Sequence, residues 1–202
     1  MKGELPSPLH IPPMRVEALP HRYVYNLLAR SVPYRAFPLC ADAADFARRV
    51  GGADMEYENN MRDALALAQD AARAGDVPVG CVVLDAEGAV IGRGRNRREE
   101  MADATAHAEI EAIREACRAR GDWRLDGCTL IVTLEPCPMC TGAIINSRLS
   151  IVVYGAREPE FGSCGSVVDL FFERYGHHPR VYGGVLAEES AALLRAFFRE
   201  KR

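Results

Sequence analysis

The sequence contains no uninterrupted apolar run of about 18 residues, the length that marks a candidate membrane-spanning helix. Its N-terminus also lacks the order of positive charge, apolar stretch and small-residue cleavage site that marks a secretory signal. These absences argue against a membrane protein and against export, and we expect a cytoplasmic location. The 202 residues, of which 49% are hydrophobic, fit one domain with a sizeable core and an additional segment.

Positive charge is also in short supply, because the net charge of the chain is −3. Nucleic-acid binding gains most of its affinity from cations at phosphates, so this balance counts mildly against a polynucleotide partner. Six arginines nevertheless lie close to the motifs described below: Arg93, Arg95, Arg97, Arg98, Arg148 and Arg157. They form either a local positive rim or an ordinary solvated surface, and the sequence leaves both interpretations open.

Proline is scarce after the first 38 residues, which hold seven of the twelve prolines. Because proline disfavours long helices and central strands, we expect little independent structure in residues 1–54. We interpret this segment as a Pro-rich extension or as the product of a misassigned start. The main domain is then predicted to cover residues 55–202.

Two short strings carry the chemistry of a metal site. One contains His107 and Glu109, and the other contains Cys137 and Cys140. Thiolate and imidazole are ligands that zinc prefers, and cysteines three residues apart lie on one helix face. His107, Cys137 and Cys140 together leave the fourth tetrahedral position for water, as in catalytic zinc sites. Taken singly, the cysteines also fit a structural zinc clip or buried thiols, and the histidine fits a core position.

Glu109 is predicted to move protons and not to bind the metal. Residues two positions apart do not share a helix face, so Glu109 is poorly placed to join His107 as a ligand, but its side chain is long enough to reach a metal-bound water. The joint pattern of a histidine, a glutamate two residues later and a Pro-Cys-x-x-Cys string is typical of zinc-dependent nucleobase deaminases.

The remaining cysteines are unevenly spaced, which favours a reducing compartment over a disulfide framework. Cys81, Cys117, Cys128 and Cys164 are interpreted as core or loop thiols. One alternative stays open, namely a closed metal site in which Cys164 is the fourth ligand.

Hydrophobic periodicity predicts alternating helices and strands over residues 61–202. A helix ends at Gly75, and strands at 79–84 and 89–93 flank a polar turn that suits an antiparallel hairpin. A second helix is predicted to be capped by Thr105, to place Ile110, Ile113 and Cys117 on one face, and to end near Gly121. The later elements are strands at 129–134 and 151–154, a helix beginning at 136–138, and a helix at 187–199 with Ala191, Leu194 and Phe198 on its core face. We therefore expect an α/β protein, a three-layer α/β/α sandwich with a five-stranded mixed sheet.

From about Met55 onward the chain resembles the bacterial tRNA-specific adenosine deaminases, and the resemblance covers about three quarters of its length. The motifs that carry it, besides the two metal strings, are DVPVG at 76–80, GRNR at 94–97, TLEPC at 133–137, SR at 147–148, YGAR at 154–157 and GGVLAEE at 183–189. The resemblance implies the cytidine-deaminase-like fold, one Zn²⁺ per chain and a homodimer. It also implies a tRNA anticodon stem-loop as partner and assigns substrate contacts to Asn96, Arg157 and Glu158, although Asn96 also fits a turn.

The chain departs from the family after Arg157. The family has an aspartate and then a lysine there, whereas this chain has Glu158, Pro159 and Glu160, followed by Phe161. Phe161 suits either stacking on a flanking base or packing into the core. In the same way, the pair His177-His178 suits either contact with RNA or an ordinary surface loop.

Three functions compete at this stage. The first is hydrolytic deamination of adenosine to inosine at the tRNA wobble position, in which zinc activates a water and Glu109 moves the protons. The second is deamination of a free nucleobase or nucleoside such as guanine, cytosine or cytidine, which uses the same metal chemistry. The third is a non-catalytic subunit that keeps zinc for folding, and Glu109 argues against it because a structural site needs no proton carrier.

Overall fold

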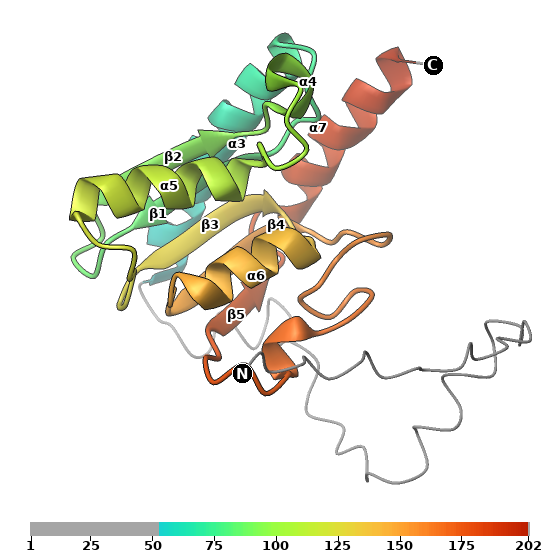
Figure 1. Cartoon of the computed structure of the whole chain (residues 1–202). Helices are drawn as coiled ribbons and strands as arrows, with labels where there is room; N and C mark the ends of the chain where they lie inside the picture. The colour runs from blue at the N-terminus through green and yellow to red at the C-terminus, as the bar shows by residue number, and fades with distance from the viewer. Residues whose placement is uncertain (1–52, 202) are drawn as a thin grey trace, which may run out of the picture. The chain divides into compact units, whose positions relative to one another are not determined.

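A mixed sheet of five strands forms the centre of the computed structural model, which describes residues 53–201 (Figure 1). The strands are β1 (Gly80–Leu84), β2 (Val90–Arg95), β3 (Thr129–Leu134), β4 (Ile151–Ala156) and β5 (Arg180–Gly183). Their order across the sheet is β2-β1-β3-β4-β5. Because β1 is antiparallel to both of its neighbours while β3, β4 and β5 are parallel, the prediction of a five-stranded mixed sheet is confirmed.

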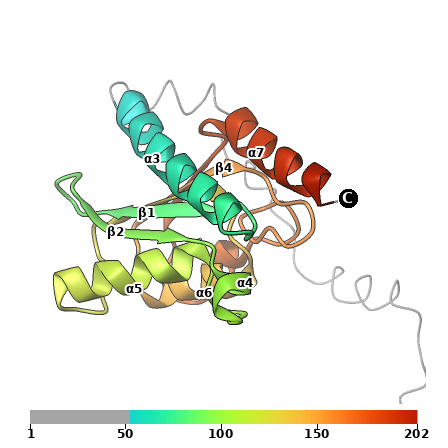
Figure 2. The same ribbon diagram turned by 90° about the horizontal axis from the view of Figure 1, so that it is seen from above.

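Helices cover both faces of this sheet. The helices are α3 (Ala53–Arg73), α4 (Arg98–Met101), α5 (Ala108–Arg120), α6 (Pro138–Asn146) and α7 (Ala187–Glu200), with a short 3-10 helix η1 (Leu170–Phe172). Figure 2 shows α3 and α7 on one face and α5 and α6 on the other. The predicted three-layer α/β/α sandwich is therefore confirmed.

Two hydrophobic cores lie on the two sides of the sheet, and neighbouring strand residues alternate between them. On β1, Val82 packs into the core that contains Met61 of α3, whereas Val83 packs into the core that contains Ala112 of α5. All residues of β1 are buried, as are those of β3 apart from Leu134. Strands covered on both faces are apolar throughout, which is the physical reason for their continuous apolar runs.

Glycines on the strands bring the helices unusually close to the sheet. A Cβ atom on Gly94 of β2 would lie 2.1 Å from the carbonyl oxygen of Ala108 and 2.6 Å from the amide nitrogen of Ala112, both in α5. Gly80 of β1 meets α3 in the same way, since a Cβ there would lie 2.0 Å from the carbonyl oxygen of Ala64. The absence of side chains at Gly94 and Gly80 therefore sets the distances of α5 and α3, respectively, from the sheet.

This close packing makes Gly94→Ala strongly destabilising. The added methyl group meets backbone atoms that cannot rotate away, so α5 must shift, and we expect a loss of about 1–3 kcal/mol in the free energy of unfolding. Urea unfolding of the native protein and the variant measures this loss of free energy. Gly142→Ala in α6 is the matched control, because nothing lies within 4 Å of its added Cβ. A helix propensity gain of up to about 1 kcal/mol should leave that variant unchanged or more stable, and equal losses in both variants would contradict the packing argument.

The start of α5 differs from the sequence prediction. Thr105 is predicted as the N-cap, but α5 begins at Ala108 with His107 as its N-cap residue. The Thr105 hydroxyl donates instead to Asp103 (2.8 Å), inside the loop that precedes the helix. The side chain of His107 consequently lies just outside the first helical turn.

The buried faces of two helices also differ from prediction. The buried residues of α5 are mostly small, which the glycines of β2 require: Ala108, Glu109, Ala112, Ile113 and Ala116. Of the predicted face Ile110, Ile113 and Cys117, only Ile113 is fully buried. On α7 the predicted core residue Phe198 is 50% exposed, and its neighbour Phe197 is buried in its place.

Residues 1–52, and with them nearly all of the predicted Pro-rich extension 1–54, lie outside the described residues. The interpretation of that segment stays a prediction. Within residues 53–201, every helix is too short or too polar to cross a lipid bilayer.

Candidate active site

Three candidate metal ligands lie at the starts of two helices. His107 immediately precedes α5, and Cys137 immediately precedes α6, whose first turn contains Cys140. Pro138 occupies the first helical position of α6, where its missing N–H leaves no hydrogen bond unmade. Because α6 follows the carboxyl end of β3, the sheet brings both helix starts to one edge, where α/β proteins usually bind ligands.

The three side chains converge on one point. Nδ1 of His107 lies 3.8 Å from Sγ of Cys137 and 3.6 Å from Sγ of Cys140, and all three donor atoms lie within 4.8 Å of one another. Sulfur and nitrogen donors on one tetrahedral zinc are separated by about 3.5 Å, given bond lengths of about 2.3 and 2.0 Å. The observed donor set and its spacing therefore fit zinc. Cys164, the alternative fourth ligand, does not belong to this group.

The side chains of Cys137, Cys140 and His107 also influence one another electrostatically. A hydrogen bond from Cys140, together with His107, holds the pKa of Cys137 down to about 4. The same hydrogen bond, with burial and the nearby Glu109, raises the pKa of Cys140. The pKa of His107 is raised mainly by its hydrogen bond with Cys137. The lowered pKa of Cys137 favours its thiolate, which is the form that binds a divalent cation.

Glu109 lies beside this cluster and is only 4% exposed. Burial raises the pKa of its carboxyl group, and the negative charge of Cys137 adds to the shift. Burial, and to a smaller extent the charge of Glu109, raises the pKa of Cys81, a fully buried thiol on β1. The carboxylate does not belong to the group of three donor atoms that could hold one ion.

Asn96 follows the end of β2 and is 6% exposed. Its backbone N–H donates to the carbonyl oxygen of Val79 (2.9 Å), which fixes the residue in place. Its side-chain oxygen Oδ1 is buried and makes no hydrogen bond with the described residues. A buried carbonyl oxygen without a donor costs about 1–3 kcal/mol, so this atom is suited to accept a hydrogen bond from a ligand.

The model for the cytidine and deoxycytidylate deaminase zinc-binding region matches residues 55–156. The chain belongs to this family of zinc-dependent deaminases. The tRNA-specific adenosine deaminase of Bacillus subtilis is 48% identical over 143 residues, which are 70% of this chain and 88% of that protein. This likeness confirms the resemblance found from the motifs.

Other relatives of the chain are much longer. The tRNA(Ile)-lysidine synthase of Deinococcus radiodurans is 53% identical over 142 residues, which are 70% of this chain but 24% of that protein. A protein of the same description from Deinococcus deserti is 48% identical over 157 residues, which are 77% of this chain and 30% of its own length. The chain therefore spans only a quarter to a third of these two relatives.

Solved structures of two functional classes share the fold. One structure belongs to a study of A-to-I editing by tRNA:A34 deaminases at the wobble position of transfer RNA. Its sequence is 46% identical, its TM-score is 0.64, and the match covers 66% of this chain and 97% of the other chain. The other is guanine deaminase from Nitrosomonas europaea, with 25% identity, a TM-score of 0.57, and coverage of 96% and 98%. Deamination is common to both descriptions, whereas the substrates differ.

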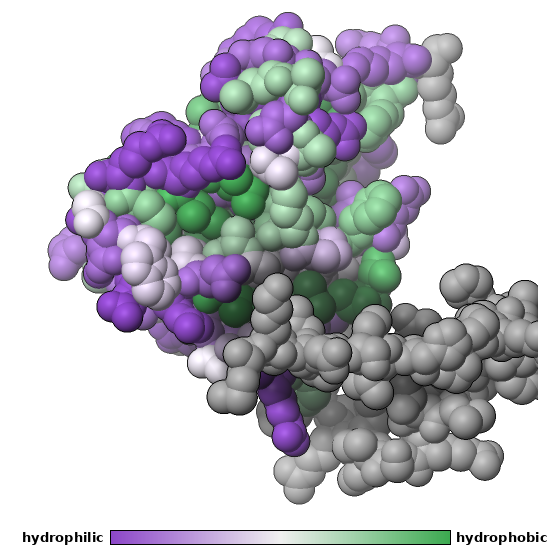
Figure 3. All heavy atoms as spheres, viewed as in Figure 1, coloured by the Kyte–Doolittle hydropathy of each residue, from purple (hydrophilic) through white to green (hydrophobic). Residues whose placement is uncertain are grey.

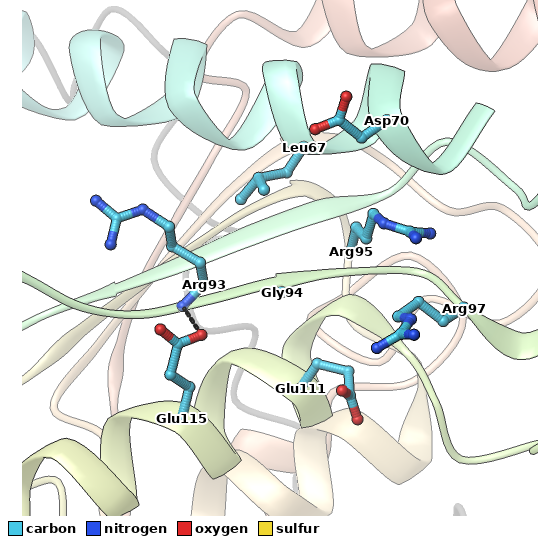
Figure 4. Close-up of a pocket in the computed structure, with 8 residues that line it drawn as sticks. All are labelled: Leu67, Asp70, Arg93, Gly94, Arg95, Arg97, Glu111 and Glu115. Carbon is cyan, nitrogen blue, oxygen red and sulfur yellow. Dashed lines mark hydrogen bonds between the residues drawn. The ribbon is translucent and has the colours of Figure 1, made fainter. Parts of the chain in front are cut away.

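Three of the four arginines in the stretch 93–98 are paired with acids. Arg93, Arg95 and Arg97 line a groove of about 440 Å³ between α3, β2 and α5 (Figure 4). Glu100 pairs with Arg97 (2.7 Å) and with Arg95 (2.5 Å), and these hydrogen bonds hold the pKa of Glu100 below its usual range. Asp70, Glu111 and Glu115 line the same groove, and Arg98 pairs with Glu99. The stretch is therefore a balanced ionic surface more than a free positive rim.

The connection between β4 and β5 contains Phe161 and the pair His177-His178, for each of which the sequence left two interpretations open. Phe161 is 64% exposed, so it is not packed into the core. His177 lies 2.6 Å from the carbonyl oxygen of Leu149 through Nε2, and Nδ1 of His178 lies 2.6 Å from that of Phe171. Both histidine side chains thus hold the loop to the protein backbone.

Arg157 and Glu158, predicted as substrate contacts, begin this loop. Arg157 is exposed and Glu158 is half-buried. The Glu158 carboxylate accepts a hydrogen bond from the backbone N–H of Glu160 (2.9 Å), and the Glu158 N–H donates to Glu135 (3.1 Å). Glu135 was not predicted from the sequence as a functional residue, although it is a carboxylate at the end of an apolar strand.

Proposed function

We propose that this protein catalyses hydrolytic deamination of adenosine to inosine at the wobble position of a tRNA. The observation that carries the proposal is the buried carboxylate of Glu109 beside a His-Cys-Cys group that fits zinc. Glu109 itself does not belong to this group. The tRNA part is supported by the relatives, since those described as adenosine deaminases and as lysidine synthases are all named for tRNA.

Each residue has a defined role in the proposed reaction. His107, Cys137 and Cys140 would hold zinc, which would supply an activated water molecule. Glu109 accepts one proton of the water and passes it to the ring nitrogen beside the amino-bearing carbon. Glu109 then takes the second proton from the new C–OH group, which becomes the carbonyl of inosine, and gives it to the departing amine. Adenosine and water give inosine and ammonia. A raised pKa suits this task, because the carboxyl group must both accept and donate a proton.

Substrate contacts are proposed for Asn96, Arg157 and Glu158. The partnerless Oδ1 of Asn96 supports a hydrogen bond to the target nucleotide. Arg157 is exposed, as a cation that meets phosphate must be. The weakest assignment is Glu158, since its carboxylate already accepts a hydrogen bond from Glu160. We assign the deaminase domain to residues 55–202. We also propose a cytoplasmic location, which is supported by the six cysteines of the described part, all of them free of disulfide bonds.

One assay separates the tRNA substrate from a free base. The native protein should form inosine in an anticodon stem-loop with adenosine at the wobble position, and release no ammonia from guanine, cytosine, cytidine or free adenosine. Ammonia release from a free base with no inosine in the stem-loop would favour the second class, for which the likeness to guanine deaminase is the supporting observation. A stem-loop with guanosine at the wobble position is the control.

We further propose a homodimer, formed through the loop that follows β4. Figure 3 shows hydrophobic residues across the middle of the face, where Figure 1 draws α5, β3 and α6, and the loop after β4 lies to the right of this area. Four large apolar side chains of the loop and of η1 are exposed: Val167, Val168, Phe172 and Tyr175. Soluble monomers rarely expose several large apolar side chains close to one another.

Light scattering should give a dimer of about 44 kDa from chains of 22.2 kDa. Phe172→Glu should weaken the dimer by about tenfold or more, because it places a charge in an apolar contact. Phe198→Glu makes the same change at an exposed phenylalanine on α7 and should leave the dimer intact. A native protein that is monomeric at micromolar concentration would contradict the proposal.

A further inference from the structure

Glu135 is a buried carboxylate with no part in the proposed reaction. It lies between β3 and α6, two residues before Cys137, and is 2% exposed. Oε1 accepts hydrogen bonds from the backbone N–H groups of Cys164 (3.0 Å) and Ser166 (3.0 Å). Oε2 accepts from the N–H of Glu158 (3.1 Å) and from the Ser166 hydroxyl. Since a carboxylate offers about four acceptor positions, all of them are used.

All four donors belong to the loop that follows β4, and none is a cation. Within the described residues, no Lys, Arg or His forms a salt bridge with Glu135. Burying a charge is unfavourable unless hydrogen bonds replace its hydration. The loop satisfies this requirement only while Glu158, Cys164 and Ser166 hold their positions around the carboxylate. Glu135 therefore fixes the course of the loop backbone.

The loop also passes directly over the carboxylate. A Cβ atom on Gly162 would lie 2.7 Å from both Cδ and Oε2 of Glu135, so only glycine allows this approach. Next to it, the N–H of Ser163 donates to the carbonyl oxygen of Pro136 (2.9 Å). The loop is thus attached at two consecutive residues, Glu135 and Pro136, of the segment that leads into Cys137.

Phe161 lies in the middle of the attached segment and points outward, being 64% exposed. We propose that Glu135 is a positioning residue that ties the loop carrying Phe161 to the junction carrying Cys137, and so places that aromatic ring beside the metal cluster for contact with a nucleotide flanking the target base. The inference rests on the proposed function for its RNA part. The attachment of the loop itself is independent of the substrate.

Glu135→Gln tests this role with little change in side-chain size. The amide has one oxygen in place of two, and its NH₂ group must face either the N–H of Glu158 or the N–H groups of Cys164 and Ser166, so at least one backbone hydrogen bond is lost. We expect KM for the anticodon stem-loop to rise by about tenfold or more, as for loss of a hydrogen bond to a charged group. Zinc content should stay at one per chain and kcat should change by less than about threefold.

Glu173→Gln is the matched control, because it removes the same charge from an exposed position in the same connection between β4 and β5. It should leave KM and kcat unchanged. Loss of zinc in Glu135→Gln, or a fall in kcat at constant KM, would overturn the proposal, because Glu135 would then serve the metal cluster or the chemical step.

Amide hydrogen exchange distinguishes failure of this inference from failure of the proposed function. In Glu135→Gln the N–H groups that lose their acceptor, either that of Glu158 or those of Cys164 and Ser166, should exchange about tenfold faster or more than in the native protein. Unchanged exchange would overturn the role of Glu135 whatever the substrate. Absence of inosine from the native protein would overturn the proposed function, while the exchange rates still decide whether Glu135 holds the loop.

Two further variants approach the same contact from the loop. Gly162→Ala presses a methyl group against the carboxylate, and Ser166→Ala removes only the hydroxyl donor. If Glu135→Gln does not fold, these variants should still show a raised KM with unchanged zinc, larger for Gly162→Ala. Native KM values in both would contradict the proposal.

Discussion

Glu109→Gln should lower turnover by about 100- to 10,000-fold while zinc stays at one per chain, because a general acid/base group contributes about that much. Glutamine keeps the shape of the buried side chain but can neither accept nor release the proton. The fold should tolerate it, since burial already favours the neutral carboxyl group and raises its pKa. Inosine formation in a stem-loop, zinc content and Tm are the measurements, and Tm should stay within about 3 °C.

Glu111→Gln is the control for this experiment. Glu111 lies two residues further along α5, pairs with Arg114 at 2.9 Å, and does not belong to the metal group. Its replacement should leave turnover within about twofold, as is usual for a surface substitution. If Glu109→Gln lost its zinc, Glu109 would be a ligand and its role as a proton carrier would be wrong.

Cys137→Ser should remove zinc and with it all turnover. A serine hydroxyl does not ionise near neutral pH, whereas the pKa of Cys137 is held at about 4. A ligand present at 100 times its Kd stabilises the fold by about 2.7 kcal/mol, which is worth roughly 5–10 °C in a domain of this size. Metal analysis and thermal unfolding with and without a chelator measure both effects.

Cys164→Ser provides the comparison. Cys164 is also buried, but it does not belong to the group of donor atoms formed by His107, Cys137 and Cys140. This variant should keep zinc and most of the activity, and chelation should lower its Tm as it does that of the native protein. Equal zinc loss in both variants would identify Cys164 as a fourth ligand and the site as closed.

Much of the fold follows from local sequence signals. The hairpin of β1 and β2 was predicted because a polar turn, Asp85 to Gly88, separates two apolar runs, and Asp85 does accept hydrogen bonds from Glu87 and Ala89. The apolar runs of β3 and β4 predicted strands buried on both faces. The fifth strand, β5, was not located, because it has four residues, begins with Arg180 and lies at the edge of the sheet.

Where local and tertiary preferences compete, the sequence prediction failed. Thr105 is a favourable N-cap residue, yet the loop before α5 engages its hydroxyl with Asp103 and leaves the cap position to His107. The core face of α5 was predicted from its large apolar residues, but Gly92 and Gly94 on the facing strand admit only small ones. Contacts between distant segments decided both outcomes.

The candidate metal ligands were predictable from residue type and spacing alone. Zinc is one of few metals that suit two cysteines three residues apart together with an imidazole that precedes a glutamate. Sequence alone could not show that the Oδ1 of Asn96 is buried without a hydrogen bond, or that Glu135 holds a loop 23 to 31 residues further along the chain. Both depend on which atoms exclude water and which donors come within about 3 Å, and only the packing of the sheet against its helices and loops decides this.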